Sequence, residues 1–252
     1  MSRALASPSL AVQRGILGAV LLIVCWEGVA RGLHLPAYVL PAVSDILLGL
    51  WSKRATLADA AGYTLLEALV GYGLGCLIGI GLAVAIVLVP ALRSAILPLA
   101  TAINSVPVVG YSPLILLWFG IGVSSKIVMV AMAVSFTILL SMLAGLDRVD
   151  RRAVDLMKSF GASRLSMLWR LRLLTALPLL LAGMRVSTVR SVIVAIVTEM
   201  LGAHGGLGWV IYQAVLQIDF VQVWSAIFVA SAASLAFFGL VGFLERKILF
   251  WR

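Results

Sequence analysis

Long apolar runs separated by short polar segments dominate the chain. A helix needs about 20 predominantly apolar residues to cross the hydrocarbon core of a bilayer, and six runs reach or approach that length. We therefore predict an all-α protein with six transmembrane helices. They are expected at about Gly15–Ala30, Ala68–Leu92, Ser94–Ser125, Ile127–Leu146, Leu173–Thr198 and Phe220–Leu244.

The first of these runs is open to two interpretations. Arg3 and Arg14 precede it, as basic residues precede the apolar core of a secretory signal peptide. No small-x-small cleavage site follows it cleanly, however, and Glu27 fits poorly in such a segment. We favour an uncleaved first helix. On this view residues 1–60 form an N-terminal span with an external segment, and residues 61–252 form the core.

Composition excludes most soluble classes of protein. The 252 residues are 63% hydrophobic and 12% charged, with a mean hydropathy of +1.15, whereas charged residues make up about a quarter of a soluble chain. The net charge of +9 comes from basic residues scattered between apolar runs, so nucleic-acid binding is not indicated. Two cysteines and two isolated histidines predict neither a disulfide scaffold nor a metal site. Phosphate-binding glycine motifs are absent, so we expect no nucleotide site or other cofactor.

The basic residues set the expected orientation in the membrane. With a cytoplasmic N-terminus, 13 of the 19 Lys and Arg residues lie on the cytoplasmic side and 4 lie outside, Lys126 among them. Cytoplasmic loops of membrane proteins carry such an excess of Lys and Arg. We predict that both termini and the segment 147–178 face the cytoplasm.

The third run contains three prolines, Pro98, Pro107 and Pro113. Proline removes a backbone donor and clashes with the preceding turn, so this helix is expected to be kinked or broken. A merely bent helix and one that lines the translocation pathway remain equally open at this point. Asn104 and Ser105 lie beside Pro107, and they are candidate pathway residues because polar groups within a span need a partner or water.

The second run has small residues four positions apart. Gly71, Gly75, Gly79 and Ala83 lie on one face of the predicted helix. This small-xxx-small pattern is typical of helices that pack closely against a neighbour in the membrane.

The segment Asp147–Pro178 is the longest polar stretch. Residues 152–160 predict a short helix, with Gly161 suited to the left-handed position after its C-terminus and Ser163 to the N-cap of the next helix. Ala153, Met157 and Phe160 form one apolar edge. Because two helical turns are not stable alone, this helix needs a surface to pack on. That surface is either a partner protein or the lipid headgroups.

The same segment carries a family resemblance. It resembles the EAA loop of permease subunits of binding-protein-dependent ABC importers, with Asp155-Leu156-Met157, Gly161, Leu171-x-Leu173 and Pro178. Asp-Leu-Met stands where the family has Glu-Ala-Ala, and the acidic residue and the glycine spacing are kept. Other segments resemble the sulfonate, taurine and nitrate branch of the family, and together they cover residues 35–245. They are Leu35-Pro36, Pro41 to Asp45, Ser105-Val106-Pro107, Ser112-Pro113-Leu114, Leu117 to Gly122, Ser125-Lys126, Gly183-Met184-Arg185, Glu199 and Gly206-Leu207-Gly208.

The resemblance implies a fold, a location and partners. It implies the type I importer permease fold in a bacterial plasma membrane, with a cytoplasmic coupling loop at 147–178. The implied partners are a cytoplasmic ABC ATPase dimer, a periplasmic or lipid-anchored solute-binding protein and a second permease copy, which we expect to form a homodimer. The residues expected to dock on the ATPase are Asp155, Met157, Lys158, Phe160 and Gly161.

Two arginines interrupt the fifth run. Arg185 lies near the expected cytoplasmic surface, where its side chain reaches the headgroups or the pathway. Arg190 lies near the midplane, and an intramembrane arginine indicates a functional site. Its partner is expected to be a bound anion on the pathway or a buried carboxylate, Glu67 or Glu27.

Function is expected to be transport without catalysis by this chain. The implied substrate is a small anion such as a sulfonate, taurine or nitrate. Glu67, a pathway candidate, occupies a position that is often basic in this branch, which keeps a pyrimidine-type vitamin precursor or riboflavin as the alternative. An ion-coupled secondary transporter is the weaker rival. It would need carboxylates deep in the membrane, and Glu27, Glu67 and Glu199 are predicted at the periphery.

Overall fold

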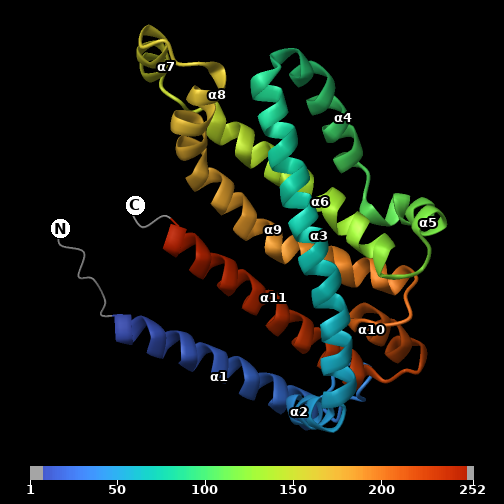
Figure 1. The fold of residues 1–252 in the computed structure, drawn as a ribbon. Coiled ribbons are helices and arrows are strands. Elements are labelled where there is room, and N and C mark those ends of the chain that lie inside the picture. Colours follow the sequence, from blue (N-terminus) through green and yellow to red (C-terminus); the bar gives the residue numbers. More distant parts are fainter. Residues whose placement is uncertain (1–7, 249–252) are drawn as a thin grey trace.

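A computed structural model describes residues 8–248, which form helices and no strands (Figure 1). The all-α prediction is therefore confirmed for this part of the chain. The elements are α1 (Pro8–Gly32), α2 (Val43–Ser52), α3 (Arg54–Leu88), η1 (Pro90–Leu92), α4 (Arg93–Ser105), α5 (Val108–Phe119), α6 (Val123–Leu146), α7 (Arg151–Ser159), α8 (Arg164–Met167), η2 (Leu168–Arg172), α9 (Leu173–Leu201), α10 (Leu207–Leu216) and α11 (Phe220–Ile248).

Five helical segments are long and apolar enough to cross a membrane, and α4 with α5 forms a sixth if the bent pair counts as one span. The two halves of that pair meet at 99°. The break lies at Val106 and Pro107, where α4 has ended and proline supplies no backbone donor. The six predicted spans are thus present, with the third broken as the prolines indicated. The division at residue 60 stays a prediction, and α3 runs across it.

The bundle has two ends that are used as reference points below. The loop end carries residues 147–172, including α7 and α8, and the opposite end carries residues 33–53 and 202–219, including α2 and α10 (Figure 1). The helices α3, α6 and α9 form the centre of the bundle, and α11 packs beside α9.

Small residues allow α3 and α6 to pack with their backbones close together. A Cβ atom added at Gly71 or Gly75 would lie 2.6 Å or 2.7 Å from the Cβ of Val130 or Val134. At Gly79 it would meet the backbone oxygen of Ser135 at 2.6 Å. Such distances are well inside van der Waals contact, so no larger residue fits without displacing α6. The predicted small-xxx-small face is confirmed as the α3–α6 contact.

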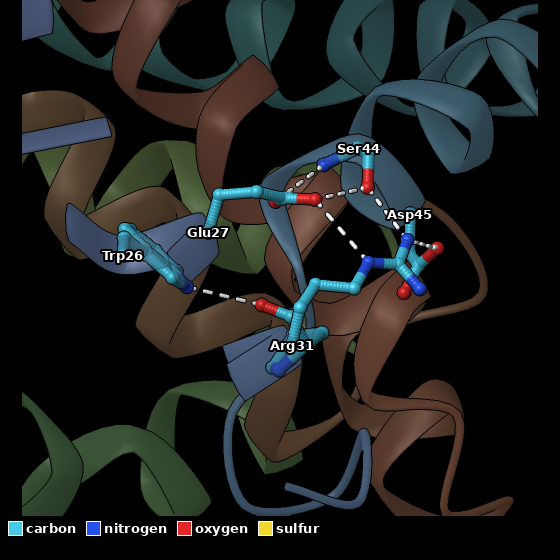
Figure 2. A network of polar contacts seen from close by, with 6 residues as sticks. Trp26, Glu27, Arg31, Ser44 and Asp45 are labelled. Atoms are coloured by element: carbon cyan, nitrogen blue, oxygen red, sulfur yellow. Dashed lines mark hydrogen bonds and ion pairs between the residues drawn. The ribbon is translucent and has the colours of Figure 1, made fainter. Parts of the chain in front are cut away.

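The helix α1 lies apart from this centre and is held at its α2 end (Figure 1). Figure 2 shows the polar network that holds it: Glu27 accepts from the Ser44 hydroxyl at 2.7 Å and from the Ser44 N–H at 3.2 Å. The Arg31 guanidinium donates to Ser44 and to Asp45 at 2.7 Å and 2.9 Å. Trp26 donates its indole N–H to the Pro41 carbonyl at 3.0 Å. Glu27 thereby satisfies an N–H in the first turn of α2.

A second polar contact joins α2 and α3 to α11 at the opposite end of the bundle. The Lys53 ammonium donates to the Asp219 carboxylate at 2.6 Å and to the Gln222 side chain at 2.7 Å. Partial burial raises the pKa of Asp219, but the hydrogen bonds from Lys53 and from the Gln222 N–H outweigh it and hold this pKa below its usual value. The pair fixes the corner between α2 and α3 against the start of α11.

The α3–α6 contact predicts different effects for two neighbouring glycines. We expect Gly75→Ala to destabilise the protein by about 1–3 kcal/mol, because the added methyl group overpacks the contact. Gly73→Ala is the matched control, since a Cβ there meets nothing within 4 Å. It should leave stability unchanged or slightly raised. Thermal unfolding of the purified protein in detergent measures both, and equal melting temperatures for the two variants would contradict the close contact.

Candidate functional sites

The helix α7 is short and well capped at both ends. The Asp150 side chain accepts from the Arg152 N–H at 2.9 Å, which satisfies the first turn. Gly161 has φ +73°, its N–H donates to the Lys158 carbonyl, and the Ala162 N–H donates to the Met157 carbonyl. These two bonds define a Schellman motif. The predicted helix and its glycine C-cap are confirmed.

The loop is joined to the fifth span by continuous helix. Ser163 caps α8 by accepting from the Ser166 N–H at 3.2 Å, as expected from the sequence. A π-helical turn at Leu168–Arg172 then joins α8 to α9 without a break, so Arg164–Leu201 is one helical segment. Because Met167 and Leu168 are buried, the start of this segment is packed against the bundle.

The two sides of α7 differ in character. Phe160 is 81% exposed and Leu156 is 58% exposed, four residues apart on one edge, while Met157 is half-buried beside them. Asp155 and Lys158 lie on the other side, joined by an ion pair of 3.4 Å, and they line a pocket under the helix. Leu156 was not predicted as part of the docking surface. Its spacing of four residues from Phe160, which places both on one side of a helix, could have indicated it.

Arg190 connects three helices near the middle of the bundle. Its guanidinium donates to the Asn104 side-chain oxygen of α4 at 2.9 Å and to the Thr137 hydroxyl of α6 at 3.3 Å. Among residues 8–248 no carboxylate pairs with it, so the expected alternative of an ion pair with Glu67 or Glu27 is wrong. Thr137 was missed because a threonine in an apolar run has no distinguishing pattern.

An apolar cavity of about 230 Å³ lies beside Asn104, between α3, α4 and α6. Ser135 is its other polar lining residue, and it donates to the Met132 carbonyl. The second predicted pathway residue of α4, Ser105, is exposed and donates to the Thr101 carbonyl at 2.8 Å. The structure therefore brings Asn104 and Arg190 together and leaves Ser105 on the surface of the chain.

Arg185, the other arginine of this span, has a protein partner. Its guanidinium lies 3.7 Å from the Glu245 carboxylate of α11 and 4.4 Å from the centre of the Phe238 ring. This ion pair and cation–π contact fix α9 against α11. The neighbouring Gly242 provides the space that the guanidinium occupies.

Three buried charged residues meet at the opposite end of the bundle. Lys126 is fully buried and donates to the carbonyls of Ile121, at 2.5 Å, and Gly202. The sequence predicts it in a loop between two spans, and that is wrong, because Lys126 lies in the first turn of α6. Its ammonium is satisfied by the carbonyl groups that follow α5 and α9, where intrahelical partners are lacking.

Glu199 is also fully buried and holds the segment that follows α9. Its carboxylate accepts from the Thr64 hydroxyl at 2.7 Å and from the Gly208 N–H at 2.6 Å. Thr64 in turn accepts from the Leu207 N–H at 2.8 Å. The glycine-rich segment after α9 is therefore fixed to α3 and to the start of α10.

Glu67 completes this group, which we call the buried charge cluster (Glu67, Lys126 and Glu199). The Glu67 carboxyl is 3% exposed and faces that of Glu199, and its Oε2 atom has no hydrogen-bond partner among the described residues. It lines a small pocket of about 110 Å³ together with His204. Glu67 is predicted as a pathway residue. It lies beside Glu199, which is about two and a half turns of α9 away from Arg190.

Comparisons with known proteins identify related chains. Residues 75–250 match the family model described as "Binding-protein-dependent transport system inner membrane component". The taurine transport system permease protein TauC of Escherichia coli is 31% identical, over 92% of this chain and 87% of its own. The formylaminopyrimidine transport permease protein ThiX of Halalkalibacterium halodurans is 30% identical, over 92% and 93%. A probable ABC transporter permease protein of Haemophilus influenzae is 29% identical, over 93% and 95%.

The fold has a counterpart among solved structures. A chain of the methionine ABC transporter MetNI, in an inward-facing conformation, superposes with a TM-score of 0.62. The match covers 75% of this chain and 96% of that one at 18% identity, and it shows that the fold is shared.

Substitutions at two lysines at the same end of the bundle test how much the buried charge cluster contributes to the stability of the fold. We expect Lys126→Met to destabilise the protein by about 3–5 kcal/mol, because two buried carbonyl groups lose their donor and the neighbouring buried carboxyl groups of Glu67 and Glu199 lose a nearby positive charge. Lys53→Met removes a half-exposed ion pair and should cost about 0–1 kcal/mol. Melting temperatures in detergent compare the two variants. A smaller loss for Lys126→Met than for Lys53→Met would show that the cluster does not stabilise the fold.

Proposed function

Since the chain belongs to the family of inner membrane components of binding-protein-dependent transport systems, we propose that it forms the solute pathway of an ATP-driven importer and couples it to a cytoplasmic ATPase. The chain is a multi-pass membrane protein of the ABC importer permease class with the type I permease fold. The main support for the coupling role is the short capped helix α7. It exposes the large apolar side chains of Leu156 and Phe160, which a partner protein could cover.

The proposed assembly follows from what the chain itself lacks. No nucleotide-binding motif occurs in the sequence, so ATP is hydrolysed by a cytoplasmic ABC ATPase dimer. A periplasmic or lipid-anchored binding protein delivers the solute, and a second copy of this chain completes the pathway as a homodimer. The protein lies in the bacterial plasma membrane with both termini and residues 147–178 cytoplasmic, as the distribution of Lys and Arg favours.

Coupling is proposed to act through α7 as a rigid body. Asp155, Met157, Lys158, Phe160 and Gly161 form the docking element together with Leu156. ATP binding brings the two ATPase subunits together, their bound loop helices approach each other, and the pathway opens outward. Because Arg164–Leu201 is one helical segment, displacement of the loop is passed directly to the span that carries Arg190.

The substrate is proposed to be a small anion such as a sulfonate, taurine or nitrate. Arg190 supports this, because arginine is a cation and, within residues 8–248, its guanidinium donates to the neutral side chains of Asn104 and Thr137 and to no carboxylate. An anion on the pathway supplies the missing counter-charge. Asn104 positions the guanidinium, while Ser105 and Glu67 are proposed to contact the solute along the same route.

A second substrate class is supported by a different observation. Glu67 is acidic, and an acidic side chain would repel an anionic solute on the pathway. In addition, the relative ThiX is named for formylaminopyrimidine transport. The alternative is therefore a pyrimidine-type vitamin precursor or riboflavin carried by the same machinery. Uptake assays with both classes of solute decide between them.

Two substitutions at Gly161 test the coupling role. Gly161→Val should abolish co-purification of the ATPase and ATP hydrolysis stimulated by the loaded binding protein, because a β-branched residue does not adopt φ +73°. Gly161→Asn should retain both, since asparagine tolerates the left-handed region. Normal stimulation in Gly161→Val, with the protein folded and inserted, would remove α7 from the mechanism.

Substitutions that remove or keep the charge of Arg190 test its proposed contact with the solute. We expect Arg190→Gln to abolish uptake of the anionic solute while assembly with the ATPase and basal ATP hydrolysis persist, because it removes a charge near the middle of α9 that has no carboxylate partner among residues 8–248. Arg190→Lys keeps the charge and should retain part of the uptake. Uptake by reconstituted vesicles is the measurement, and undiminished transport in Arg190→Gln would exclude an anion site at this residue.

A further inference from the structure

A charged pocket of about 460 Å³ lies between α7 and the ends of the spans at the loop end. Arg151, Val154, Asp155 and Lys158 line it from α7, and their spacing places them on one face of the helix. The remaining walls come from the end of α6 and from η2. They are Leu146, Asp147, Val149 and Arg172. The pocket faces the bundle, on the side of α7 away from the exposed Leu156 and Phe160 edge.

Positive charge remains in the pocket after every ion pair is counted. Asp147 is held by two hydrogen bonds from Arg93, at 2.7 Å and 3.3 Å, and Asp155 pairs with Lys158 at 3.4 Å. Within residues 8–248, neither Arg151 nor Arg172 has a carboxylate within ion-pair distance. Both carboxylates of the pocket are thus occupied, and two guanidinium groups remain available for an anionic ligand.

The pocket lies at the depth where phospholipid phosphates are expected. Leu146 is the last residue of the α6 span and is buried, and Arg172 directly precedes the first residue of α9. Around Arg172 the side chains of Trp169 and Leu174 are 65% and 57% exposed. A tryptophan at this level is typical of the membrane interface. An apolar surface for an acyl chain therefore begins directly beside the charged pocket.

We propose that this pocket binds the phosphate of an anionic phospholipid through Arg151 and Arg172. Guanidinium groups bind phosphate oxygens in a bidentate manner, and basic pockets between spans on the cytoplasmic side bind anionic headgroups. The proposal rests on the cytoplasmic orientation of the loop given above. The bound headgroup bridges α7 to η2 and holds the loop helix against the bundle. The Leu156 and Phe160 edge stays free for the ATPase, as do the largely exposed side chains of Asp155 and Lys158, which do not contact the phosphate in this proposal.

Lipid binding to the purified permease alone tests the proposal. The protein is placed in nanodiscs of phosphatidylcholine with increasing phosphatidylglycerol, and the lipid retained after extraction is counted by native mass spectrometry. The double variant Arg151→Gln/Arg172→Gln should bind phosphatidylglycerol about thirtyfold more weakly than the parent, since each basic residue near an anionic lipid contributes about 1 kcal/mol. Phosphatidylcholine retention should not change.

A matched variant separates a defined pocket from general surface attraction. Arg164→Gln/Arg170→Gln removes the same charge from exposed positions of the same loop outside the pocket. It should keep parental retention of phosphatidylglycerol. Equal losses in the two double variants would overturn the pocket. Melting temperatures of both variants, measured in phosphatidylcholine, verify that each is folded.

Two further outcomes would assign the pocket to another ligand. Displacement of phosphatidylglycerol by millimolar inorganic phosphate would show that the pocket takes free phosphate. Normal lipid retention in Arg151→Gln/Arg172→Gln, together with lost co-purification of the ATPase, would show that an acidic side chain of the ATPase occupies it. Because the lipid measurement needs no ATPase, its failure leaves the importer proposal standing, and Gly161→Val tests that proposal separately.

Discussion

The close contact of α3, α6 and α9 is the constraint on which the other features depend. Lipid chains are as apolar as leucine side chains, so helices in a bilayer gain little from burying apolar surface against each other. Association rests on close packing, which needs small residues at the contact. Gly75 meets Val134 across α3 and α6, and Gly145 lies against Ala176 across α6 and α9. With these contacts fixed, α7 is held at the end of α6, and Arg190 is held beside Thr137.

The charged groups of the bundle are distributed according to what surrounds them. At its two ends, ion pairs such as Arg93–Asp147 and Lys53–Asp219 are partly exposed and contribute little to stability. Inside, where water is excluded, each charge needs a protein partner. Lys126 donates to carbonyl groups, Glu199 accepts from a hydroxyl and an N–H, and Arg190 donates to an amide oxygen and a hydroxyl. Lys126 and Glu199 also belong to one cluster of opposite charges, whereas among residues 8–248 no carboxylate lies within ion-pair distance of Arg190. This difference makes Arg190 a candidate for contact with solute.

Local features were predictable from the sequence because local chemistry determines them. Gly161 at a left-handed position, Ser163 at an N-cap and the break at Pro107 each depend on one residue and its immediate neighbours. Tertiary partners were not predictable in the same way. Lys126 resembled a loop lysine, because the two carbonyls that bind it lie 5 and 76 residues away along the chain. The partner of Arg190 was expected to be a bound anion or a carboxylate, whereas the fold brings an amide and a hydroxyl to it.

The uninterrupted helix from Arg164 to Leu201 also has a mechanical consequence. Its 38 residues span about 57 Å at the rise of an α-helix, with the loop at one end and Glu199 at the other. Gly183 lies near its midpoint, against Ser141 of α6 with no room for a side chain, which makes that crossing a fulcrum. A tilt of about 5° around this point moves each tip by roughly 2.5 Å in opposite directions. In the proposed importer, this helix would act as a lever, and a push at the loop would displace the opposite end of the helix in the opposite direction.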